Sequence, residues 1–289
     1  MIPVSNLDAA MLYAETPEMP MHTMGVLILE RQELPAEPDQ ESLSSFELTR
    51  QVFSERIHRI PPFRRRVVQG PLQVGDPHWI EDPEFDLDRH LVHATLPSPG
   101  TMRELCELVG SFASTCLSRD RPLWKAILVE GLEGDRLALL MKIHHAAMDG
   151  GRAAAIAGEL LDTSPEGRDV PPPEDTWIPD REPSVPWLAT DTIRTLLGKP
   201  RRALEATARI RAAARARSDS EPPSPKDESR QEKQPLFEAP PTPFNGALSA
   251  DRSVALVDVP FDDVKAIKRS FETTVNDVVL AACTASLRS

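Results

Sequence analysis

The chain has 289 residues, which is enough for one large domain or two modest ones with a real hydrophobic core. Hydrophobic residues make up 40% and charged residues 27%, and the net charge of −12 argues against nucleic acid as a partner, because phosphate binding needs a basic face. Three cysteines form no paired framework, so we expect reduced, buried thiols and a cytoplasmic location. The sequence contains no run of 18 apolar residues, so we expect no transmembrane helix.

The first 62 residues predict helix, strand and helix. Ser5 is a typical N-cap for a short helix over 6–15, and the strongly apolar stretch 22–30 predicts a strand. Helical spacing of apolar residues follows over 41–57, and the proline pair at 61–62 ends that helix. Its expected apolar face consists of Leu43, Phe46, Phe53 and Ile57.

The next 83 residues continue in the same alternating manner. Residues 78–97 predict a strand, a turn and a strand, and residues 101–120 predict an amphipathic helix. Two strands over 123–132 and 135–145 then follow, joined by the turn EGDR. The apolar face of the helix is expected to hold Met102, Leu105, Val109, Phe112 and Cys116.

Composition divides the chain into three parts. Residues 1–163 read as a compact N-terminal lobe. Residues 164–250 are rich in proline and charge and predict a linker, with a basic helix embedded over 187–218. Residues 251–289 predict a strand, a helix and a further capped helix, which we interpret as the start of a second, truncated lobe.

The stretch KIHHAAMDGGR at 142–152 contains two adjacent histidines and an aspartate at a strand-to-helix junction. Strand alternation places His145 on one face with Leu137, Leu139, Met141 and Ile143, and places His144 on the other face. After Gly150, a helix is expected whose apolar stripe consists of Ala153, Ile156, Ala157 and Leu160. Reactive side chains are commonly displayed at such junctions.

Three interpretations of the histidine pair can be compared. A metal site is disfavoured, because neighbouring strand residues point to opposite faces and no other cluster has ligand spacing. The pair can be purely structural, with Asp149 capping the following helix. Alternatively, a neutral His145 can act as a general base toward an alcohol or amine, because imidazole titrates near neutrality. No serine or cysteine lies in a nucleophile-elbow context, so direct transfer is favoured over a covalent acyl-enzyme.

The stretch HHAAMDGG resembles the HHxxxDG motif of acyl-CoA-dependent acyltransferases related to chloramphenicol acetyltransferase and to peptide-synthetase condensation domains. Further stretches resemble, more narrowly, the bacterial wax ester synthase/diacylglycerol acyltransferase family, and they cover nearly the whole chain apart from the linker. They are LDAAMLYAETPEMPMHTMGVLILE (7–30), PPFRRRVV (61–68), HWIEDPEFDLDRHL (78–91), DRPLWKAILVEGL (120–132) and TVNDVVLAACTASLR (274–288).

The resemblance implies an α/β fold of the chloramphenicol-acetyltransferase type, a sandwich of mixed sheet and helices, with one full lobe and the start of a second. It implies that His145 takes the proton from the hydroxyl of a diacylglycerol or a fatty alcohol, whose oxygen then attacks the thioester of acyl-CoA. Acyl-CoA is the substrate, and no cofactor or metal is expected. His144 would support His145, Asp149 would hold the turn, and Gly150 would keep the channel mouth open.

Two further motifs of the family are matched. Pro122, Leu123 and Trp124 match its PLW motif, and Asn276 and Asp277 match its ND motif. For these five residues we expect structural roles, namely a buried tryptophan and a helix cap, in place of direct chemistry.

Two expectations concern partners. Members of the family continue well past the end of this chain. The alternative function is therefore an impaired half-enzyme that binds lipid, CoA or a partner chain. We expect such a chain to associate with a complementing lobe or with itself. Arginine and lysine interleaved with leucine over 187–218 suit contact with anionic lipid at the inner face of the plasma membrane or at lipid inclusions. A solvated linker helix is the other interpretation of that segment.

Overall fold

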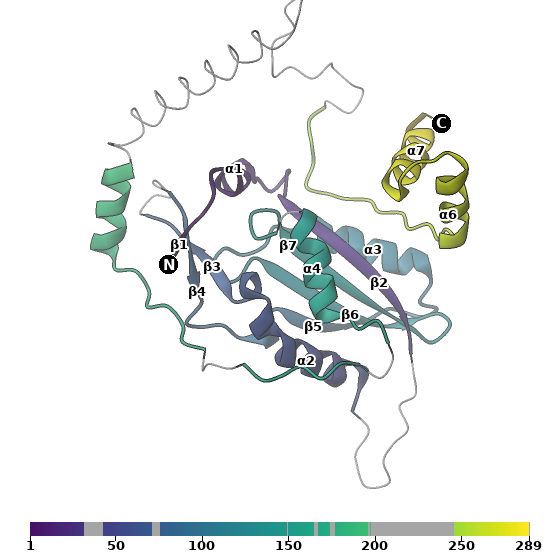
Figure 1. The fold of residues 1–289 in the computed structure, drawn as a ribbon, viewed down its shortest axis with the longest axis horizontal. Coiled ribbons are helices and arrows are strands. Elements are labelled where there is room, and N and C mark those ends of the chain that lie inside the picture. Colours follow the sequence, from purple (N-terminus) through teal and green to yellow (C-terminus); the bar gives the residue numbers. More distant parts are fainter. Residues whose placement is uncertain are drawn as a thin grey trace, which may run out of the picture.

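The computed structural model describes residues 1–31, 43–70, 76–148, 150–164, 167–173, 177–195, 197 and 246–288, and Figure 1 shows their course. Two sequence predictions therefore lie wholly or partly outside the described residues. Asp149 is one of them. The other is the basic helix over 187–218, of which only the first part is described, as part of a helix over 185–195.

Strands and helices alternate along the first 160 residues, as the sequence predicts. The strands are β1 (Ile2–Pro3), β2 (His22–Glu30), β3 (Arg65–Val68), β4 (His78–Glu81), β5 (Leu91–Thr95), β6 (Trp124–Leu132) and β7 (Arg136–His144). The helices are α1 (Asn6–Ala14), α2 (Ser45–Arg56), α3 (Met102–Ala113), α4 (Gly150–Leu160), α6 (Phe261–Ser270) and α7 (Val275–Arg288). Short 3₁₀ turns occupy Ile57–Arg59, Pro61–Phe63 and Leu87–Arg89.

The main sheet has the strand order β2-β7-β6-β5. The β2–β7 and β6–β7 pairs are antiparallel, whereas β5 and β6 are parallel. A parallel pair needs a crossover connection, and α3 supplies it between β5 and β6. In the β2–β7 pair, His22 lies opposite His144 and Glu30 opposite Arg136. The register therefore places the start of β2 beside the end of β7, where the histidine pair lies.

Helices cover both faces of this sheet, with α2 and α4 on one side and α3 on the other (Figure 1). The packing confirms that successive side chains of β7 point to opposite faces of the sheet, as the sequence predicts. Leu139 and Ile143 belong to a core shared with α2 and α4, while Ala138 and Leu140 belong to a second core under α3. Each face of the sheet is thus buried against helices, which explains why β6 and β7 are nearly continuous apolar runs.

A smaller sheet, β1-β4-β3, lies beside the main one. Part of the proline-rich segment is docked on it. The backbone N–H of Glu81 donates to Asp180 Oδ2 at 2.9 Å, and the Trp177 indole donates to Glu81 Oε2 at 3.0 Å. Trp187, in the helix over 185–195, packs edge-on against His78. The described part of this segment is therefore held by the N-terminal lobe.

The strand predicted to begin at 251 is absent, because residues 251–260 form no ladder. The segment is nevertheless extended, and alternate residues face inward: Val254 and Leu256 pack on the core under α3. Arg252 donates its N–H to Ser114 Oγ at 3.0 Å, just beyond the end of α3. The predicted strand is therefore wrong: the segment packs one-sidedly against a helix, which offers no ladder partners.

Several smaller expectations were wrong. Leu43 precedes α2 and is exposed, and Cys116 follows α3 and is exposed, because each helix is shorter than its apolar pattern. Ala157 is exposed, although Ile156 and Leu160 are buried as expected. The cysteines are not buried: Cys283 is exposed like Cys116, and Cys106 is half-buried.

Candidate active site

The histidine pair lies where β7 ends and a tight turn begins. The N–H of His144 donates to Leu123 O at 2.9 Å, and the N–H of His145 donates to Met21 O at 2.8 Å. The turn is closed by the N–H of Ala147, which donates to His144 O at 2.9 Å. Both histidines are therefore fixed through their backbones to two different neighbouring segments, one before β6 and one before β2.

His145 is exposed, and its imidazole Nε2 lies 3.0 Å from Thr23 Oγ1. The turn thus directs this ring toward β2 at the edge of the main sheet. A Cβ added at Gly25, two residues further along β2, would meet nothing within 4 Å, so open space adjoins this part of the strand. The arrangement shows that Nε2 can take a hydroxyl oxygen within hydrogen-bond distance, which is the geometry that general-base chemistry on an alcohol needs.

His144 is completely buried, and its contacts define its tautomer. The N–H of Ala146 donates to His144 Nδ1 at 2.9 Å, so this nitrogen carries the lone pair. The ring proton of the neutral imidazole is then on Nε2, which lies 3.4 Å from Glu15 Oε1. This contact does not have the geometry of a hydrogen bond, and Nε2 has no hydrogen-bond partner among the described residues. The supporting role that the resemblance implies for His144 stays a prediction.

Glu15 is a buried carboxylate that the sequence did not single out. Its Oε1 accepts the N–H of Met21 at 3.2 Å, and its Oε2 accepts from Arg119 Nη2 at 3.1 Å. Burial raises the pKa of Glu15, but the contact with His144, followed by the hydrogen bonds from Arg119 and Met21, outweighs it and holds the pKa at about 2. Glu15 is therefore ionised at neutral pH behind the histidine pair.

Two more basic groups, the buried Lys142 and the half-buried His22, interact electrostatically with this carboxylate. Lys142 Nζ donates to the carbonyls of Phe112 and Thr115, each at 2.7 Å, at the C-terminal end of α3, where a cation is favoured. Burial, and then the charge of Lys125, lower the pKa of Lys142 to about 8. Burial and then the charge of Lys142 lower the pKa of His22 to about 4, against the opposing attraction of Glu15.

The PLW stretch lies against the histidine pair. Trp124 is 2% exposed and stacks on Phe63 and His90, with ring centroids 4.2 and 4.7 Å apart. Its indole N–H donates to Phe63 O at 2.9 Å. Trp124 is thus buried as expected, and Leu123 holds the backbone of His144. Pro122 precedes them, and its carbonyl accepts the Trp124 N–H.

The ND stretch opens α7, as the sequence predicts, but the N-cap is Thr274. The N–H of Asp277 donates to Thr274 Oγ1 at 3.2 Å, and the N–H of Thr274 donates to Asp277 Oδ2 at 2.9 Å. Asp277 therefore closes a capping box, and Asn276 lies in the first turn. Both side chains are exposed, in a helix pair that lies apart from the main sheet (Figure 1).

Two motif residues complete the site. Gly150 begins α4, directly after the turn, so the expected strand-to-helix junction is confirmed. Asp149 lies outside the described residues, and its role stays a prediction. Within the described part of the chain, no group of three His, Cys, Asp or Glu side chains could hold a metal ion.

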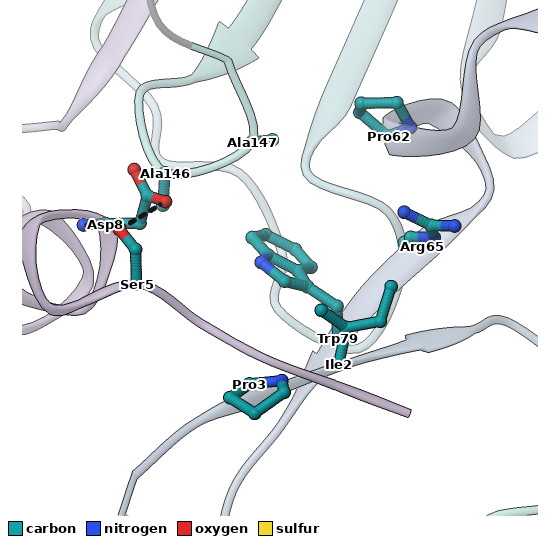
Figure 2. A pocket seen from close by; sticks show the side chains of 9 residues that line it. All are labelled: Ile2, Pro3, Ser5, Asp8, Pro62, Arg65, Trp79, Ala146 and Ala147. Atoms are coloured by element: carbon teal, nitrogen blue, oxygen red, sulfur yellow. Dashed lines mark hydrogen bonds between the residues drawn. The ribbon is translucent and has the colours of Figure 1, made fainter.

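A pocket of about 210 Å³ lies beside the turn, against Ala146 and Ala147. Figure 2 shows the Trp79 ring lying across it, with the Arg65 guanidinium on one side and the Ser5–Asp8 hydrogen bond on the other. Its walls thus combine an aromatic surface with one cationic and one anionic group. The remaining lining residues are Ile2, Pro3 and Pro62.

The α/β fold, with one exposed and one buried histidine at the end of β7, agrees with the family resemblance of the sequence. The family described as the wax ester synthase/diacylglycerol acyltransferase catalytic domain matches residues 4–279. The chain belongs to this family. Among solved structures it is similar to the wax ester synthase/diacylglycerol acyltransferase from Marinobacter aquaeolei VT8, with a TM-score of 0.61 and 27% identity, over 99% of this chain and 60% of that one.

Relatives in Mycobacterium tuberculosis H37Rv differ in length. Rv3087, which carries diacylglycerol O-acyltransferase in its printed name, is 36% identical over 99% of this chain and 58% of its own length. The protein tgs3, which carries the same term in its printed name, is 30% identical over 93% of this chain and 96% of its own length. The chain thus spans little more than half of Rv3087 but nearly all of tgs3.

The sequence patterns did not identify the residues that surround the histidine pair, namely Glu15, Arg119, Lys142 and Thr23. Only one of them carried a signal: Lys142 is a charged residue inside an apolar strand, which calls for a buried partner. Glu15 ends a short helix and looked like an ordinary surface residue, because its partners come from distant segments.

Proposed function

We propose that this chain transfers a fatty acyl group from acyl-CoA to the hydroxyl of a diacylglycerol or of a long-chain alcohol, with His145 as the general base. The observation that carries the proposal is the position of His145 Nε2, which lies 3.0 Å from a hydroxyl oxygen while the ring is exposed to an incoming substrate. Membership of the family supports the reaction class.

The steps balance without a cofactor. Nε2 takes the proton from the acceptor hydroxyl as its oxygen forms a bond to the thioester carbonyl carbon. The carbon–sulfur bond then breaks, and the imidazolium returns the proton to the departing CoA thiolate. The ester and free CoA leave with the histidine restored to its neutral form.

The pocket in Figure 2 supports a binding place for part of a substrate beside the turn. Its aromatic and apolar walls suit a hydrocarbon or ring surface, while Arg65 and Asp8 suit the polar part of an amphipathic molecule. Acyl-CoA, diacylglycerol and long-chain alcohols all have this mixed character.

We infer a cytoplasmic protein in peripheral contact with membrane or lipid-inclusion surfaces, where these acceptors reside. Among the described residues, no helix is long and apolar enough to cross a bilayer. The helix over 185–195 exposes Trp187 and Ile193, and Leu197 just beyond it is 77% exposed. Apolar side chains next to a basic stretch support contact with anionic lipid.

A second candidate function is a module that binds lipid, CoA or a partner chain without turnover. The observation that favours it is the apolar surface of the C-terminal helix pair, where Phe271, Leu280 and Leu287 are more than half exposed. Exposed apolar faces of this kind mark interaction surfaces.

The experiment that decides between the two compares wild type with His145→Ala. Radiolabelled acyl-CoA is incubated with dioleoylglycerol or hexadecanol, and the ester is quantified by thin-layer chromatography. Loss of a general base is expected to reduce turnover about 100- to 10,000-fold, while circular dichroism stays unchanged because the side chain is exposed. A variant that keeps more than half of the activity would rule out His145 as the base. Binding without any turnover by the wild type would favour the module.

A further inference from the structure

The carboxylate of Glu15 contacts the first histidine directly and the backbone support of the second. Its Oε1 accepts the N–H of Met21, whose own carbonyl accepts the N–H of His145. The same Oε1 lies 3.4 Å from His144 Nε2. One oxygen atom therefore holds the ring of the first histidine and, through a single peptide unit, the backbone of the second.

We propose that Glu15 is a positioning residue for the acyl-transfer site: it accepts the Met21 N–H and faces the His144 ring, so that the Met21–His145 backbone contact keeps His145 toward the substrate. The proposal rests on the function proposed above for His145. Glu15 itself does not touch the reacting atoms.

The surroundings leave Glu15 little freedom to serve another purpose. Its side chain is 5% exposed, so it is not a surface charge. A buried carboxylate is retained only where charged or hydrogen-bonded partners compensate for lost hydration. Arg119 supplies the charge, and the same guanidinium donates to Leu12 O near the end of α1. Arg119 thus fixes both the carboxylate and the helix that carries it.

The tautomer of His144 explains why an acceptor is required at this place. The Ala146 N–H occupies Nδ1, so the ring proton must be on Nε2. His144 is 0% exposed, and water has no ready access to that proton. Glu15 Oε1 faces this proton from 3.4 Å, although the contact is not aligned as a full hydrogen bond. Loss of the carboxylate would remove this attraction from a buried donor and favour a shift of the ring and of the turn that follows it.

Loss of Glu15 is also expected to affect the side of His145 that faces the substrate, because Met21 lies next to that side. Met21 immediately precedes β2, and Thr23 on that strand contacts His145 Nε2. Release of the Met21 N–H would loosen the start of β2 and the His145 backbone together. A catalytic group misplaced by about 1 Å can lose on the order of 100-fold in rate.

The test compares Glu15→Ala, Glu15→Gln and a matched control, Glu18→Gln, which removes an exposed charge from the same loop. With acyl-CoA and dioleoylglycerol, Glu15→Ala is expected to lower kcat about 10- to 100-fold with little change in KM. Glu15→Gln should restore most of this loss, because its amide oxygen can still accept both N–H groups. Glu18→Gln should match wild type.

A second readout needs no turnover. Amide hydrogen exchange, followed by NMR on the ¹⁵N-labelled full chain, should be at least several-fold faster at Met21 and His145 in Glu15→Ala, and close to wild type in Glu15→Gln. If Glu15→Ala does not fold, Glu15→Asp takes its place, because it keeps the charge but shortens the reach. It is then expected to show the same faster exchange.

Two results would overturn the inference. The first is a folded Glu15→Ala or Glu15→Asp variant with wild-type exchange at Met21 and His145. The second is a Glu15→Gln variant as impaired as Glu15→Ala. Failure of the proposed function is distinguishable, because it appears as turnover retained by His145→Ala, whatever the exchange at Met21 shows.

Discussion

The carbonyl of Leu123 accepts the N–H of His144 at 2.9 Å, so the PLW stretch and the histidine pair form one structural unit. Trp124, the next residue, is buried between aromatic rings. The PLW stretch thus holds the end of β7 through its backbone.

Trp124→Ala is expected to destabilise the fold by about 3–5 kcal/mol, because it leaves a large cavity and breaks the indole bond to Phe63 O. The matched control is Trp187→Ala, since Trp187 is 40% exposed and should cost less than about 1 kcal/mol. Urea unfolding followed by circular dichroism measures both. Equal losses in the two variants would contradict the assignment of Trp124 as a core residue.

Local pattern was sufficient to predict the elements that carry the site. The apolar runs of β6 and β7, the turn between them and the junction with α4 all follow from residues close in sequence. The placement of His145 at the end of β7 follows in the same way. What local pattern could not supply was the set of groups packed behind the motif, because Glu15 and His144 meet only through the β2–β7 register.

The segment 251–260 shows a second limit. Its alternation predicted a strand, and one-sided burial was found, yet a strand also needs a neighbour with free ladder groups. Here the neighbour is α3, whose Gly110 allows the close approach of Arg252. Whether an extended segment pairs or merely packs depends on tertiary context.

Gly110→Ala is expected to dislodge this segment. A Cβ at position 110 would lie 2.5 Å from the carbonyl oxygen of Arg252, so one of the two backbones must move. Hydrogen exchange or limited proteolysis across 246–260 should therefore increase. An alanine at Gly158, where nothing lies within 4 Å of the added Cβ, is the control and should leave the segment protected. Equal protection in both variants would show that the contact with α3 is loose.

The ionised carboxylate of Glu15 is expected to contribute to the free energy of unfolding, and acid is expected to remove this contribution. Its pKa is about 2 in the folded chain against an ordinary value of 4.5, so the unfolded chain binds a proton more readily. The contribution is therefore complete above pH 4.5 and is lost as the pH falls toward 2, with a size on the order of 3 kcal/mol. The free energy of unfolding of wild type minus that of Glu15→Gln should shrink over this window. A difference that stays constant from pH 5 to pH 2.5 would argue against the buried ion pair.

Membrane contact is expected to depend on the basic half of the segment 187–218. Arg211, Arg215 and Arg217 changed together to serine should reduce co-sedimentation with vesicles containing anionic lipid, and salt should reduce wild-type binding in the same way. Vesicles of neutral lipid serve as the control. Unchanged binding of the triple variant at low salt would leave a solvated linker helix as the interpretation of this segment.

The contact between Thr23 and His145 yields the last prediction. The Thr23 hydroxyl is within hydrogen-bond distance of Nε2, the nitrogen proposed to take the proton, and it can hold the ring in its reactive orientation before substrate binds. Thr23→Val keeps the shape and removes the hydroxyl. Loss of one neutral hydrogen bond of about 1 kcal/mol corresponds to roughly a five-fold lower kcat/KM. Thr23→Ser keeps the hydroxyl and should retain most of the activity. Since the side chain is exposed, neither change should alter the unfolding free energy by more than about 0.5 kcal/mol. If Thr23→Val is as active as wild type, the orientation of His145 is set by its backbone contact with Met21 alone, and the hydroxyl beside Nε2 is only a placeholder for the acceptor.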